Sequence, residues 1–239
     1  MAAARLQQDE TVLEIGPGRG ALTRQLCAVA KHVIAIEIDP KLHAYLADGL
    51  SEYGNLDLRL GDALNYDYGL LPAGTVVVAN LPYYVSTPVL VRLLEARAWF
   101  ARMIVMLQTE VARRLVAKPG TGDYGRLSVL AQYAADVSLQ FHVSPSCFRP
   151  RPKVGSSVVS LVTRREPVVP VRDEAMFHRV VRACFAHRRK MISNSLRDEG
   201  WLPESIAAAL VRAAIEPTRR AETCTIVEFA ALAAALEAE

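Results

Sequence analysis

The segment Asn80-Leu81-Pro82-Tyr83 brings an amide, peptide carbonyls and an aromatic ring together within four residues. The carbonyl oxygens can accept hydrogen bonds from an exocyclic amino group, and the ring can stack on the face of a flat base. Pro82 favours an extended conformation at Leu81, which fixes the direction of the carbonyl groups. The segment is therefore a candidate site for chemistry on the amino group of a base, although the same residues would also suit an ordinary strand-to-helix turn.

The stretches around this segment alternate between strand-like and helix-like patterns. Strands are predicted at 11–15, 33–38, 56–60, 75–79 and 102–108, and helices at 21–30, 40–53, 87–97 and 110–117. That alternation predicts an α/β fold, in which a parallel sheet carries helices on both faces. In such a sheet the segment 80–83 lies at the carboxyl end of a buried strand, the edge where open α/β sheets bind ligands.

The pattern changes after residue 117. A helix is predicted at 125–135, and strands at 136–143 and 156–162 flank a loop with three prolines, which indicates an antiparallel hairpin that closes the sheet. Residues 167–170 resemble a short linker, and helices are predicted at 174–197, 203–214 and 225–236. We therefore predict a larger α/β domain at 1–166 and a small helical domain at 171–239.

Basic residues gather in two stretches that contain no acid, although the net charge of the 239 residues is only +3. Local basic patches of this kind suit a polyanionic partner. The first stretch holds Arg149, Arg151, Lys153, Arg164 and Arg165, and the second holds Arg179, Arg182, Arg188, Arg189, Lys190 and Arg197.

The four cysteines, Cys27, Cys147, Cys184 and Cys224, form no CxxC pair. We expect reduced thiols of a cytoplasmic protein, with neither a disulfide framework nor a metal site. Apolar runs are shorter than a membrane span, and the first residues lack the apolar segment of a signal peptide. We therefore expect no membrane association.

Three strand ends carry residues that suit an adenosine group. The turn 14–20 contains three glycines, which permit a tight turn and a close approach to a ligand. Glu37 ends the second predicted strand, where a carboxylate can bind both ribose hydroxyls, and Asp62 follows the third, where it can accept from an adenine amino group. Each feature alone would suit an ordinary turn or a solvated strand end. An NAD site would share the turn and Glu37 but would not explain Asp62 followed by the segment 80–83. The set therefore favours S-adenosylmethionine. This cofactor has no phosphates, so it does not require a helix N-terminus directed at an anion.

Eight ordered segments together resemble one known family, the rRNA adenine N6-dimethyltransferases of the KsgA type. They lie at 13–18, 36–37, 61–63, 80–83, 108–114, 123–128, 148–154 and 185–190, so the resemblance covers nearly the whole chain. It implies a Rossmann-like S-adenosylmethionine-dependent methyltransferase sheet as the catalytic domain at 1–166, and a small RNA-binding helical domain at 171–239.

The resemblance also implies an activity: transfer of two methyl groups to each of two adjacent adenines in a hairpin near the 3′ end of small-subunit rRNA, on the immature small ribosomal subunit. It places the cofactor, S-adenosylmethionine, at Gly16, Glu37, Asp62 and Asn80, and its motifs add Glu14, Gly18 and Ala63. We expect a cytoplasmic monomer that needs no metal. The family also carries a Gln-Asn/His-Phe-Leu motif before its first strand, which helps to cover the cofactor. That motif does not occur in these residues, so we expect this chain alone to bind the cofactor weakly.

Four other functions stay open at this point. Macrolide-resistance methyltransferases act on large-subunit rRNA and are near relatives, but residues 124–128 and 188–190 look closer to the KsgA type. A ribosome-assembly factor with secondary catalysis would keep the basic surface, although intact Glu37, Asp62 and Asn80 favour a working site. A methyltransferase for a small molecule is disfavoured by the basic helices. One for DNA is disfavoured by the form Asn-Leu-Pro-Tyr, since DNA amino-methyltransferases usually carry Asp/Asn-Pro-Pro-Tyr.

The predicted catalytic set is Asn80, Leu81, Pro82 and Tyr83. The Asn80 side-chain oxygen and the Leu81 carbonyl are expected to accept from the adenine amino group, which localises its lone pair for attack on the methyl group. Tyr83 would stack on one face of the base and Phe148 on the other, although Phe148 would also serve to pack its loop on the sheet.

The RNA surface is expected on the helix at 174–197. Its period places Arg179, Arg182, Arg189 and Lys190 on one face and Val180, Val181, Cys184, Met191 and Ile192 on the other, with Arg188 as an exception on the apolar side. No acid lies among these cations for i,i+4 pairing, which favours phosphate binding over a merely solvated face. Arg113, Arg114 and Arg126 would extend this track near the active site.

Overall fold

The computed structural model describes residues 2–187 and 189–237, and the chain folds into two compact units. The sheet unit comprises residues 1–112 and 135–165, and the helical unit comprises residues 113–134 and 166–239. The chain therefore enters the helical unit twice, once before the last two strands and once after them. The assignment of catalysis to 1–166 and of RNA binding to 171–239 stays a prediction.

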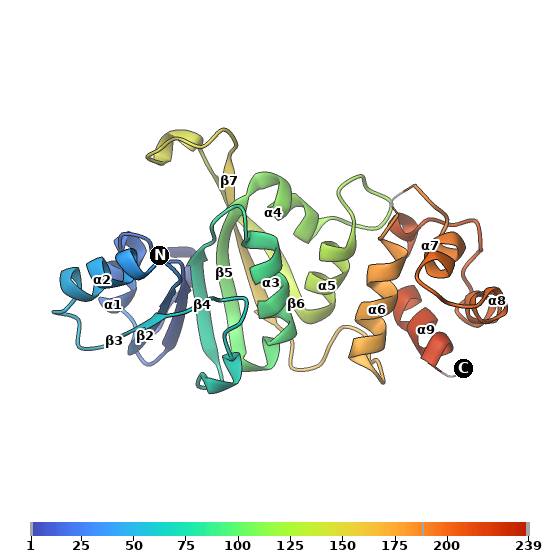
Figure 1. The fold of residues 1–239 in the computed structure, drawn as a ribbon, viewed down its shortest axis with the longest axis horizontal. Coiled ribbons are helices and arrows are strands. Elements are labelled where there is room, and N and C mark those ends of the chain that lie inside the picture. The colour runs from blue at the N-terminus through green and yellow to red at the C-terminus, as the bar shows by residue number, and fades with distance from the viewer. Residues whose placement is uncertain (1, 188, 238–239) are drawn as a thin grey trace. The chain divides into compact units, whose positions relative to one another are not determined.

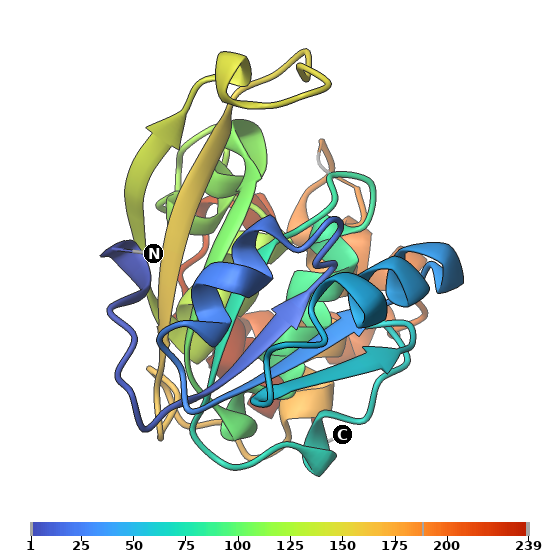
Figure 2. The same ribbon diagram turned by 90° about the vertical axis from the view of Figure 1, so that its left-hand side faces the viewer.

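The sheet unit is built on a sheet in which the described residues form seven strands, in the order β3-β2-β1-β4-β5-β7-β6 (Figures 1 and 2). The strands are β1 Thr11–Ile15, β2 His32–Glu37, β3 Leu56–Leu60, β4 Thr75–Asn80, β5 Phe100–Gln108, β6 Ala135–Val143 and β7 Ser156–Thr163. Strands β1 to β5 run parallel, and β7 lies antiparallel to both β5 and β6. The predicted α/β class and the antiparallel hairpin are confirmed.

The strand order reverses between β1 and β4. Strands β2 and β3 lie on one side of β1, whereas β4 and β5 lie on the other. Open α/β sheets bind ligands outside the carboxyl ends of the strands at such a reversal. The parallel register pairs Val12 with Val76 and Leu13 with Val77, so the turn after β1 and the end of β4 emerge at the same edge.

Apolar side chains bury the central strands. Strands β1, β2 and β4 are buried along nearly their whole length, as continuous apolar runs in parallel sheets usually are. Asn80 is the last residue of β4 and its exposed one. A polar side chain is thereby held at the end of a rigid, buried element.

Helices α1 Ala21–Cys27, α2 Pro40–Gly49, α3 Ser86–Glu95 and α4 Thr109–Val116 follow β1, β2, β4 and β5. The Asp39 carboxylate caps α2 by accepting from the amides of Lys41 and Leu42. Gly20 precedes α1 with a φ of 79°, and a Cβ there would lie 2.9 Å from the Leu46 side chain, so this close approach requires glycine. Short 3-10 turns lie at Ala2–Ala4, Tyr68–Leu70, Arg97–Trp99, Pro145–Cys147 and Ala221–Thr223.

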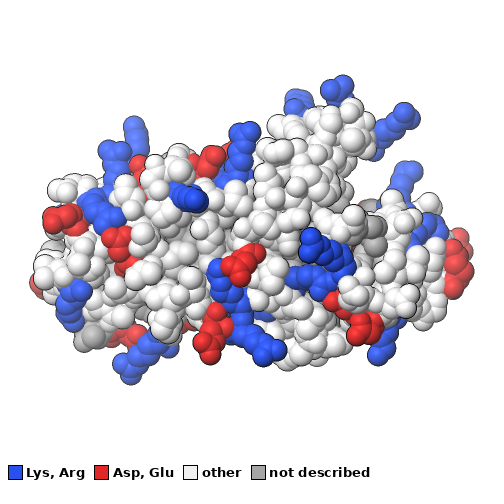
Figure 3. Space-filling model, turned by 180° about the vertical axis from the view of Figure 1, so that it is seen from behind, with Lys and Arg blue, Asp and Glu red and all other residues white. Residues whose placement is uncertain are grey.

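The hairpin formed by β6 and β7 extends beyond the rest of the sheet unit at the carboxyl edge of β5 (Figures 1 and 2). Residues 144–155 join the two strands, and we call this segment the hairpin arm. Lys and Arg side chains stand out from the arm with no Asp or Glu among them (Figure 3).

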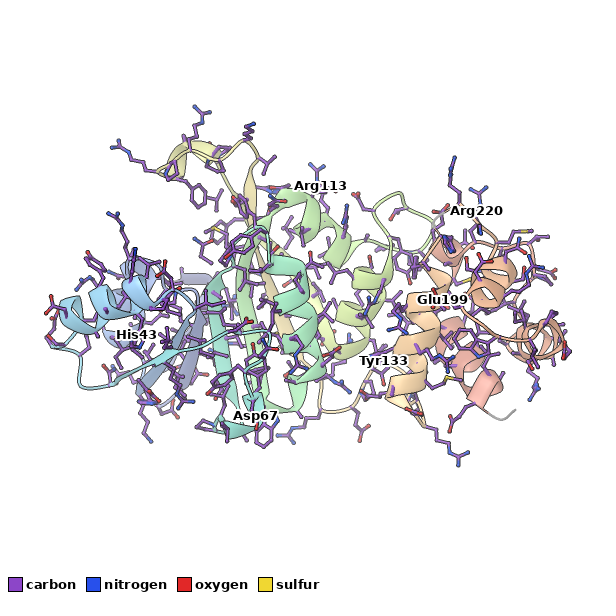
Figure 4. The ribbon with its side chains drawn as sticks, in the orientation of Figure 1. His43, Asp67, Arg113, Tyr133, Glu199 and Arg220 are labelled. Carbon is purple, nitrogen blue, oxygen red and sulfur yellow. The ribbon has the colours of Figure 1, made fainter. Side chains whose placement is uncertain are left out.

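The helical unit contains α5 Arg126–Ala134, α6 Glu174–Cys184, α7 Ile192–Asp198, α8 Pro203–Arg212 and α9 Ile226–Glu237. Its apolar core includes Phe177 and Phe229, and the Tyr133 ring packs on Phe177 with centroids 4.6 Å apart. Figure 4 shows Tyr133 beside α6, where its hydroxyl donates to Glu174 Oε1 at 3.1 Å. Helix α5 therefore belongs to this core, although it precedes β6 in the sequence.

The single helix predicted at 174–197 is wrong, because α6 ends at Cys184 and α7 begins only at Ile192. Ile192 is buried in the same core as Cys184, and its amide donates to the Arg219 carbonyl at 2.9 Å. A backbone partner distant in the sequence therefore holds the chain in a turn, and the periodicity of 174–197 alone cannot report such a partner.

No helix within residues 2–187 and 189–237 is long and apolar enough to cross a membrane. In the same part of the chain, no three His, Cys, Asp or Glu side chains come together as a metal-binding group. The four cysteines are free thiols, and all but Cys147 are buried.

Candidate active site

Four strand ends meet at one edge of the sheet unit. The turn after β1 carries Gly16 and Gly18, β2 ends at Glu37, Asp62 follows β3, and β4 ends at Asn80. They come together because parallel neighbouring strands all end at the same edge. Two adjoining cavities lie there, one over β1, β2 and β3 and one over β4 and the hairpin arm.

The first cavity has a volume of about 280 Å³. Two carboxylates and the backbone of the glycine turn face it together with apolar side chains. Five predicted cofactor residues line it, namely Gly16, Gly18, Glu37, Asp62 and Ala63, and the apolar wall includes Ile38, Leu42, Tyr84 and Val89. An apolar slot with a few fixed polar groups is the usual form of a small-molecule site.

Glu37 is held in place by two backbone amides. The residue is only 5% exposed, and its Oε1 accepts from the Asp39 amide at 3.0 Å and its Oε2 from the Gly18 amide at 3.3 Å. Gly18 adopts a φ of 60°, which glycine reaches without strain and which brings its amide to the carboxylate. Each carboxylate oxygen keeps a further lone pair. Glu37 can therefore accept two more hydrogen bonds, the number that a pair of vicinal hydroxyls donates.

Asp62 is fixed by the turn that it begins. Its Oδ1 accepts from the Leu64 amide at 2.9 Å, and its Oδ2 accepts from the Asn65 side chain at 2.8 Å. The carboxylate is thereby held on the wall of the first cavity. It retains lone pairs that can accept from a ligand amino group.

Glu14, also predicted as a cofactor residue, does not line either cavity. It is only 1% exposed, and one of its carboxyl oxygens has no hydrogen-bond partner among the described residues. Burial, with a smaller contribution from the nearby Glu37 carboxylate, raises the pKa of the Glu14 carboxyl to about 7. The structure therefore places this acid inside the protein beside the glycine turn, and direct cofactor contact by Glu14 stays a prediction.

The second cavity has a volume of about 340 Å³ and is open to solvent. It is lined by all four predicted catalytic residues, by Gly16, and by Phe148, Pro150 and Pro152 of the hairpin arm. Gly16 and Pro82 line both cavities. A Cβ on Gly16 would lie 3.5 Å from the Pro82 ring, so these two residues are adjacent and form the common wall of the two cavities.

The Asn-Leu-Pro-Tyr loop is fixed at its middle and its end. Leu81 is buried, and its amide donates to the Met106 carbonyl at 3.2 Å. The Tyr83 hydroxyl shares a hydrogen bond with Ser156 Oγ at 2.6 Å. The Asn80 side chain, in contrast, is exposed and makes no hydrogen bond within the described residues. Its side-chain oxygen is free to accept a hydrogen bond, and the role of Asn80 toward an incoming amino group stays a prediction.

Several residues of the site are not evident from the sequence. Tyr84 is 81% exposed and lines the first cavity directly after the predicted loop. Pro150 and Pro152 line the second cavity, and Ser156 holds Tyr83 from 73 positions away. The prolines of residues 144–153 mark this segment in the sequence as a distinctive loop. That it lies against the Asn-Leu-Pro-Tyr loop follows only from the pairing of β5 with β7.

The cations predicted to bind RNA do not share one helix face. Arg179 and Arg182 lie exposed on α6, whereas Arg189 and Lys190 lie exposed in the turn before α7. The predicted common face is therefore wrong, because it assumes a helix that continues past Cys184. Arg188, the expected exception, lies outside the described residues.

Two of these cations have partners inside the helical unit. The Arg179 guanidinium lies 4.4 Å from the centre of the Trp201 ring, and Lys190 Nζ lies 2.6 Å from Asp198 Oδ2. The Lys190 hydrogen bond holds the pKa of Asp198 below its usual range. Lys190 thus has an acidic partner eight positions along the chain, because α7 folds back and brings Asp198 to it.

The remaining predicted cations lie on neighbouring elements. Arg113 and Arg114 are exposed on α4, where Figure 4 marks Arg113, and Arg126 is exposed at the start of α5. Their role in RNA binding stays a prediction.

Comparisons with known proteins connect this arrangement with one family. The family described as ribosomal RNA adenine dimethylase matches residues 1–237. The ribosomal RNA small subunit methyltransferase A of Moorella thermoacetica is 46% identical over 246 residues, which cover 98% of this chain and 85% of that protein. The protein of the same name from Geobacillus kaustophilus is also 46% identical, and the match covers 98% of this chain and 83% of that protein.

Two solved structures resemble the whole chain. A dimethyladenosine transferase from Plasmodium falciparum has a TM-score of 0.79 and 27% identity, with coverage of 97% of this chain and 91% of that one. The 23S rRNA methyltransferase ErmE has a TM-score of 0.69 and 29% identity, with coverage of 99% of this chain and 94% of that one.

A parallel sheet with a cavity at its reversal point, and with an Asn-Leu-Pro-Tyr pocket adjoining that cavity, is the arrangement expected of a methyltransferase that acts on amino groups. More narrowly, this chain belongs to the ribosomal RNA adenine dimethylase family. The resemblance predicted from the eight sequence segments is thereby confirmed, and the protein is an rRNA adenine dimethyltransferase.

Proposed function

We propose that this chain uses S-adenosylmethionine to place two methyl groups on N6 of each of two adjacent adenines in a hairpin near the 3′ end of small-subunit rRNA. The substrate is the immature small ribosomal subunit, and the reaction belongs to subunit biogenesis. Relatives named small subunit methyltransferase A, at 46% identity, support this choice of RNA.

The common wall of the two cavities carries the proposal. Gly16 and Pro82 border both the cavity with the adenosine-binding features and the cavity with the Asn-Leu-Pro-Tyr loop. A cofactor in the first and a base in the second would meet at this wall. That is the arrangement that direct group transfer between two bound molecules needs, since it holds both reactants in position for an in-line displacement.

The first cavity fits the proposed cofactor. Glu37 has lone pairs for two ribose hydroxyls, and Asp62 has them for an adenine amino group. Ile38, Leu42 and Val89 supply apolar surface for the ring. When bound, the cofactor supplies a methyl group on a positively charged sulfur.

The second cavity fits an adenine amino group. The free amide of Asn80 and the Leu81 carbonyl accept from its N–H groups and hold the nitrogen lone pair toward the common wall. An amide cannot act as a strong base, and the methylated nitrogen loses its proton readily to water. Tyr83 and Phe148 hold the ring of the base, and the open side of this cavity leaves space for the first methyl group during the second transfer.

The helical unit binds the rRNA backbone. The exposed cations proposed for this contact are Arg113, Arg114, Arg126, Arg179, Arg182, Arg189 and Lys190. The Trp201 ring under Arg179 and the Asp198 carboxylate beside Lys190 orient these two side chains without burying them. We further propose that the protein acts as a monomer without a metal and works in the cytoplasm, where its substrate is assembled.

A macrolide-resistance function on large-subunit rRNA is the second candidate. The likeness to the 23S rRNA methyltransferase ErmE, at 29% identity and a TM-score of 0.69, is the observation that favours it. Identity to the small-subunit relatives is higher, at 46%, which is why the small subunit is preferred.

The test is a transfer assay with a mapped product. The chain is incubated with S-adenosylmethionine that carries a labelled methyl group, and with small or large subunits from a strain that lacks these methylations. The proposal predicts label on two adjacent adenines of small-subunit rRNA, as dimethyladenine. Label on large-subunit rRNA would support the second candidate, and no label on either RNA would contradict both.

A further inference from the structure

The hairpin arm carries three cations beside the second cavity. We propose that Arg149, Arg151 and Lys153 bind the phosphates that flank the target adenine, so that the arm holds the RNA strand against the Asn-Leu-Pro-Tyr loop. The proposal rests on the proposed function. It identifies the surface of the sheet unit that binds the RNA backbone next to the second cavity.

The sequence of the arm alternates between pocket residues and cations. Phe148, Pro150 and Pro152 line the second cavity, whereas the residues that follow each of them, Arg149, Arg151 and Lys153, do not. All three cations are exposed. A nucleotide presents the same two sides, an apolar base and a charged backbone. A base that enters the cavity therefore brings its phosphates to the segment that carries the charges.

The three cations are free to bind an external anion. None of them has an ion pair or a side-chain hydrogen bond within residues 2–187 and 189–237. The sequence holds no acid between Asp136 and Glu166, and the Asp136 carboxylate is paired with Arg164, at the opposite end of the hairpin from the arm. Figure 3 shows the same separation, with no acidic side chain on the arm. The charge of the arm is therefore not neutralised by the protein.

The base of the arm is anchored to both neighbouring strands. The Gly155 carbonyl accepts from the Thr109 amide at 2.9 Å, and a Cβ on Gly155 would lie 3.3 Å from Thr109 Oγ1. On the β6 side, His142 Nδ1 lies 2.8 Å from Ser157 Oγ. An arm held at both strands loses less conformational freedom on binding than a loose loop would.

The anchor also connects the arm with the loop that holds the base. Ser156 is buried at the first position of β7, and its hydroxyl lies 2.6 Å from the Tyr83 hydroxyl. The ring that stacks on the adenine and the cations that bind its phosphates are thus fixed to one strand end. We expect the arm to set the position of the strand and not the choice of base, because phosphate contacts carry no sequence information.

The test compares two triple variants that lose the same charge. The arm variant is Arg149→Gln, Arg151→Gln and Lys153→Gln. The control variant is Arg5→Gln, Lys31→Gln and Arg165→Gln, three exposed cations of the sheet unit that lie toward the opposite edge of the sheet. Binding to a short hairpin RNA with two adjacent adenines in its loop is measured by fluorescence anisotropy from about 50 to 200 mM salt.

The arm variant is expected to bind this RNA at least about tenfold more weakly at low salt, and the slope of log K against log salt should become shallower by about 2 to 3, at 0.7–0.9 for each lost phosphate contact. A scrambled hairpin should lose as much affinity. S-adenosylmethionine binding should stay at the level of the parent, which also reports that the variant is folded.

Equal affinity and equal salt slope in the parent and the arm variant would overturn the proposal, and so would an equal loss in the control variant, since the effect would then come from net charge alone. Failure of the parent to methylate small-subunit rRNA would contradict the proposed function instead. The two failures are distinguished because the salt slope needs no methyl transfer.

Discussion

The sheet unit and the helical unit hold their polar side chains in different ways. In the sheet unit, Glu37 and Tyr83 are fixed by hydrogen bonds of 2.6 to 3.3 Å, and Asn80 ends a buried strand. In the helical unit, Arg182 and Arg189 are exposed and have no side-chain partner among the described residues. Groups whose positions are fixed before the substrate binds can stabilise a transition state, whereas exposed surface cations mainly attract the phosphates of the RNA. Single substitutions should therefore have large effects at the strand ends and small, additive effects on the helices.

The largest effect is expected for Asn80→Ala. This variant should lose about 2.7–4 kcal/mol of transition-state stabilisation, as expected for removal of one positioned polar group in an active site. Single-turnover methyl transfer should fall accordingly, while S-adenosylmethionine binding stays close to normal.

Asn194→Ala in the helical unit is the matched control, since this surface amide accepts from the Arg197 side chain and makes no other side-chain hydrogen bond among residues 2–187 and 189–237. It should methylate like the parent. Near-normal single-turnover rates for Asn80→Ala would remove Asn80 from the catalytic set and would weaken the contrast between the units.

The next effect concerns stability and pH. The Glu14 carboxyl titrates near pH 7 in the folded protein, against an ordinary value of 4.5. The folded state therefore binds one more proton between these values, so stability decreases as pH rises from about 4.5 to 7 and stays low above that range. The decrease should reach up to about 3 kcal/mol. Urea unfolding of the parent at pH 5 and pH 8 should show it, and Glu14→Gln should lack it.

Asp198→Asn, in the helical unit, tests a pH dependence of stability that has the opposite sign to that of Glu14. The pKa of this exposed carboxyl is lowered by Lys190, so its contribution is present at neutral pH and disappears only in acid. Exposed ion pairs contribute little, so the substitution should change the free energy of unfolding only slightly.

For the Glu14 prediction, identical pH profiles of stability for Glu14→Gln and the parent would show that the Glu14 carboxyl is not held in its neutral form.

An effect smaller than those of Asn80 and Glu14 is expected for Glu37→Ala. Loss of charge-assisted hydrogen bonds to the ribose should weaken S-adenosylmethionine binding by about 1.5–3 kcal/mol. Calorimetric titration is the measurement, and Glu52→Ala is the control, because Glu52 is an exposed acid of the same unit whose contact is a surface pair with Arg24 at 3.4 Å. Unchanged affinity in Glu37→Ala would exclude the ribose role.

The smallest effects are expected from the helical cations, and the structure divides them into two pairs. Replacing Arg179, Arg182, Arg189 and Lys190 together should make the salt slope of RNA binding shallower by up to about 3. The pair Arg182→Ala and Arg189→Ala should change the slope more than the pair Arg179→Ala and Lys190→Ala, because Lys190 is already paired with Asp198. Methylation that stays normal, with an unchanged slope in the fourfold variant, would make these cations a solvated surface.

Local patterns in the sequence were enough to locate the strand ends. Alternation of apolar strands with helices predicts a parallel sheet, and a parallel sheet brings the ends of its strands to one edge. Gly16, Glu37, Asp62 and Asn80 could therefore be placed together without coordinates. The ordered motifs then identified the family.

The helical unit was predicted less well, because its turns depend on partners far along the chain. The period of 174–197 continues through the turn after Cys184, but the bond from the Ile192 amide to the Arg219 carbonyl ends it. The same fold-back brings Asp198 to Lys190. Helix α5 belongs with this unit because Tyr133 packs on Phe177, which no pattern within 125–135 can report.

The sequence by itself determined the class of fold, the family and the edge of the sheet that carries the site, since each follows from residue types at short spacing. The tertiary structure alone decided that Glu14 is buried, that Gly16 and Pro82 form a common wall, and that the hairpin arm borders the base pocket. These features come from the order of β1, β4, β5 and β7 across the sheet. Strand order is set by the packing of distant apolar surfaces, and it leaves no trace in the local spacing of residues.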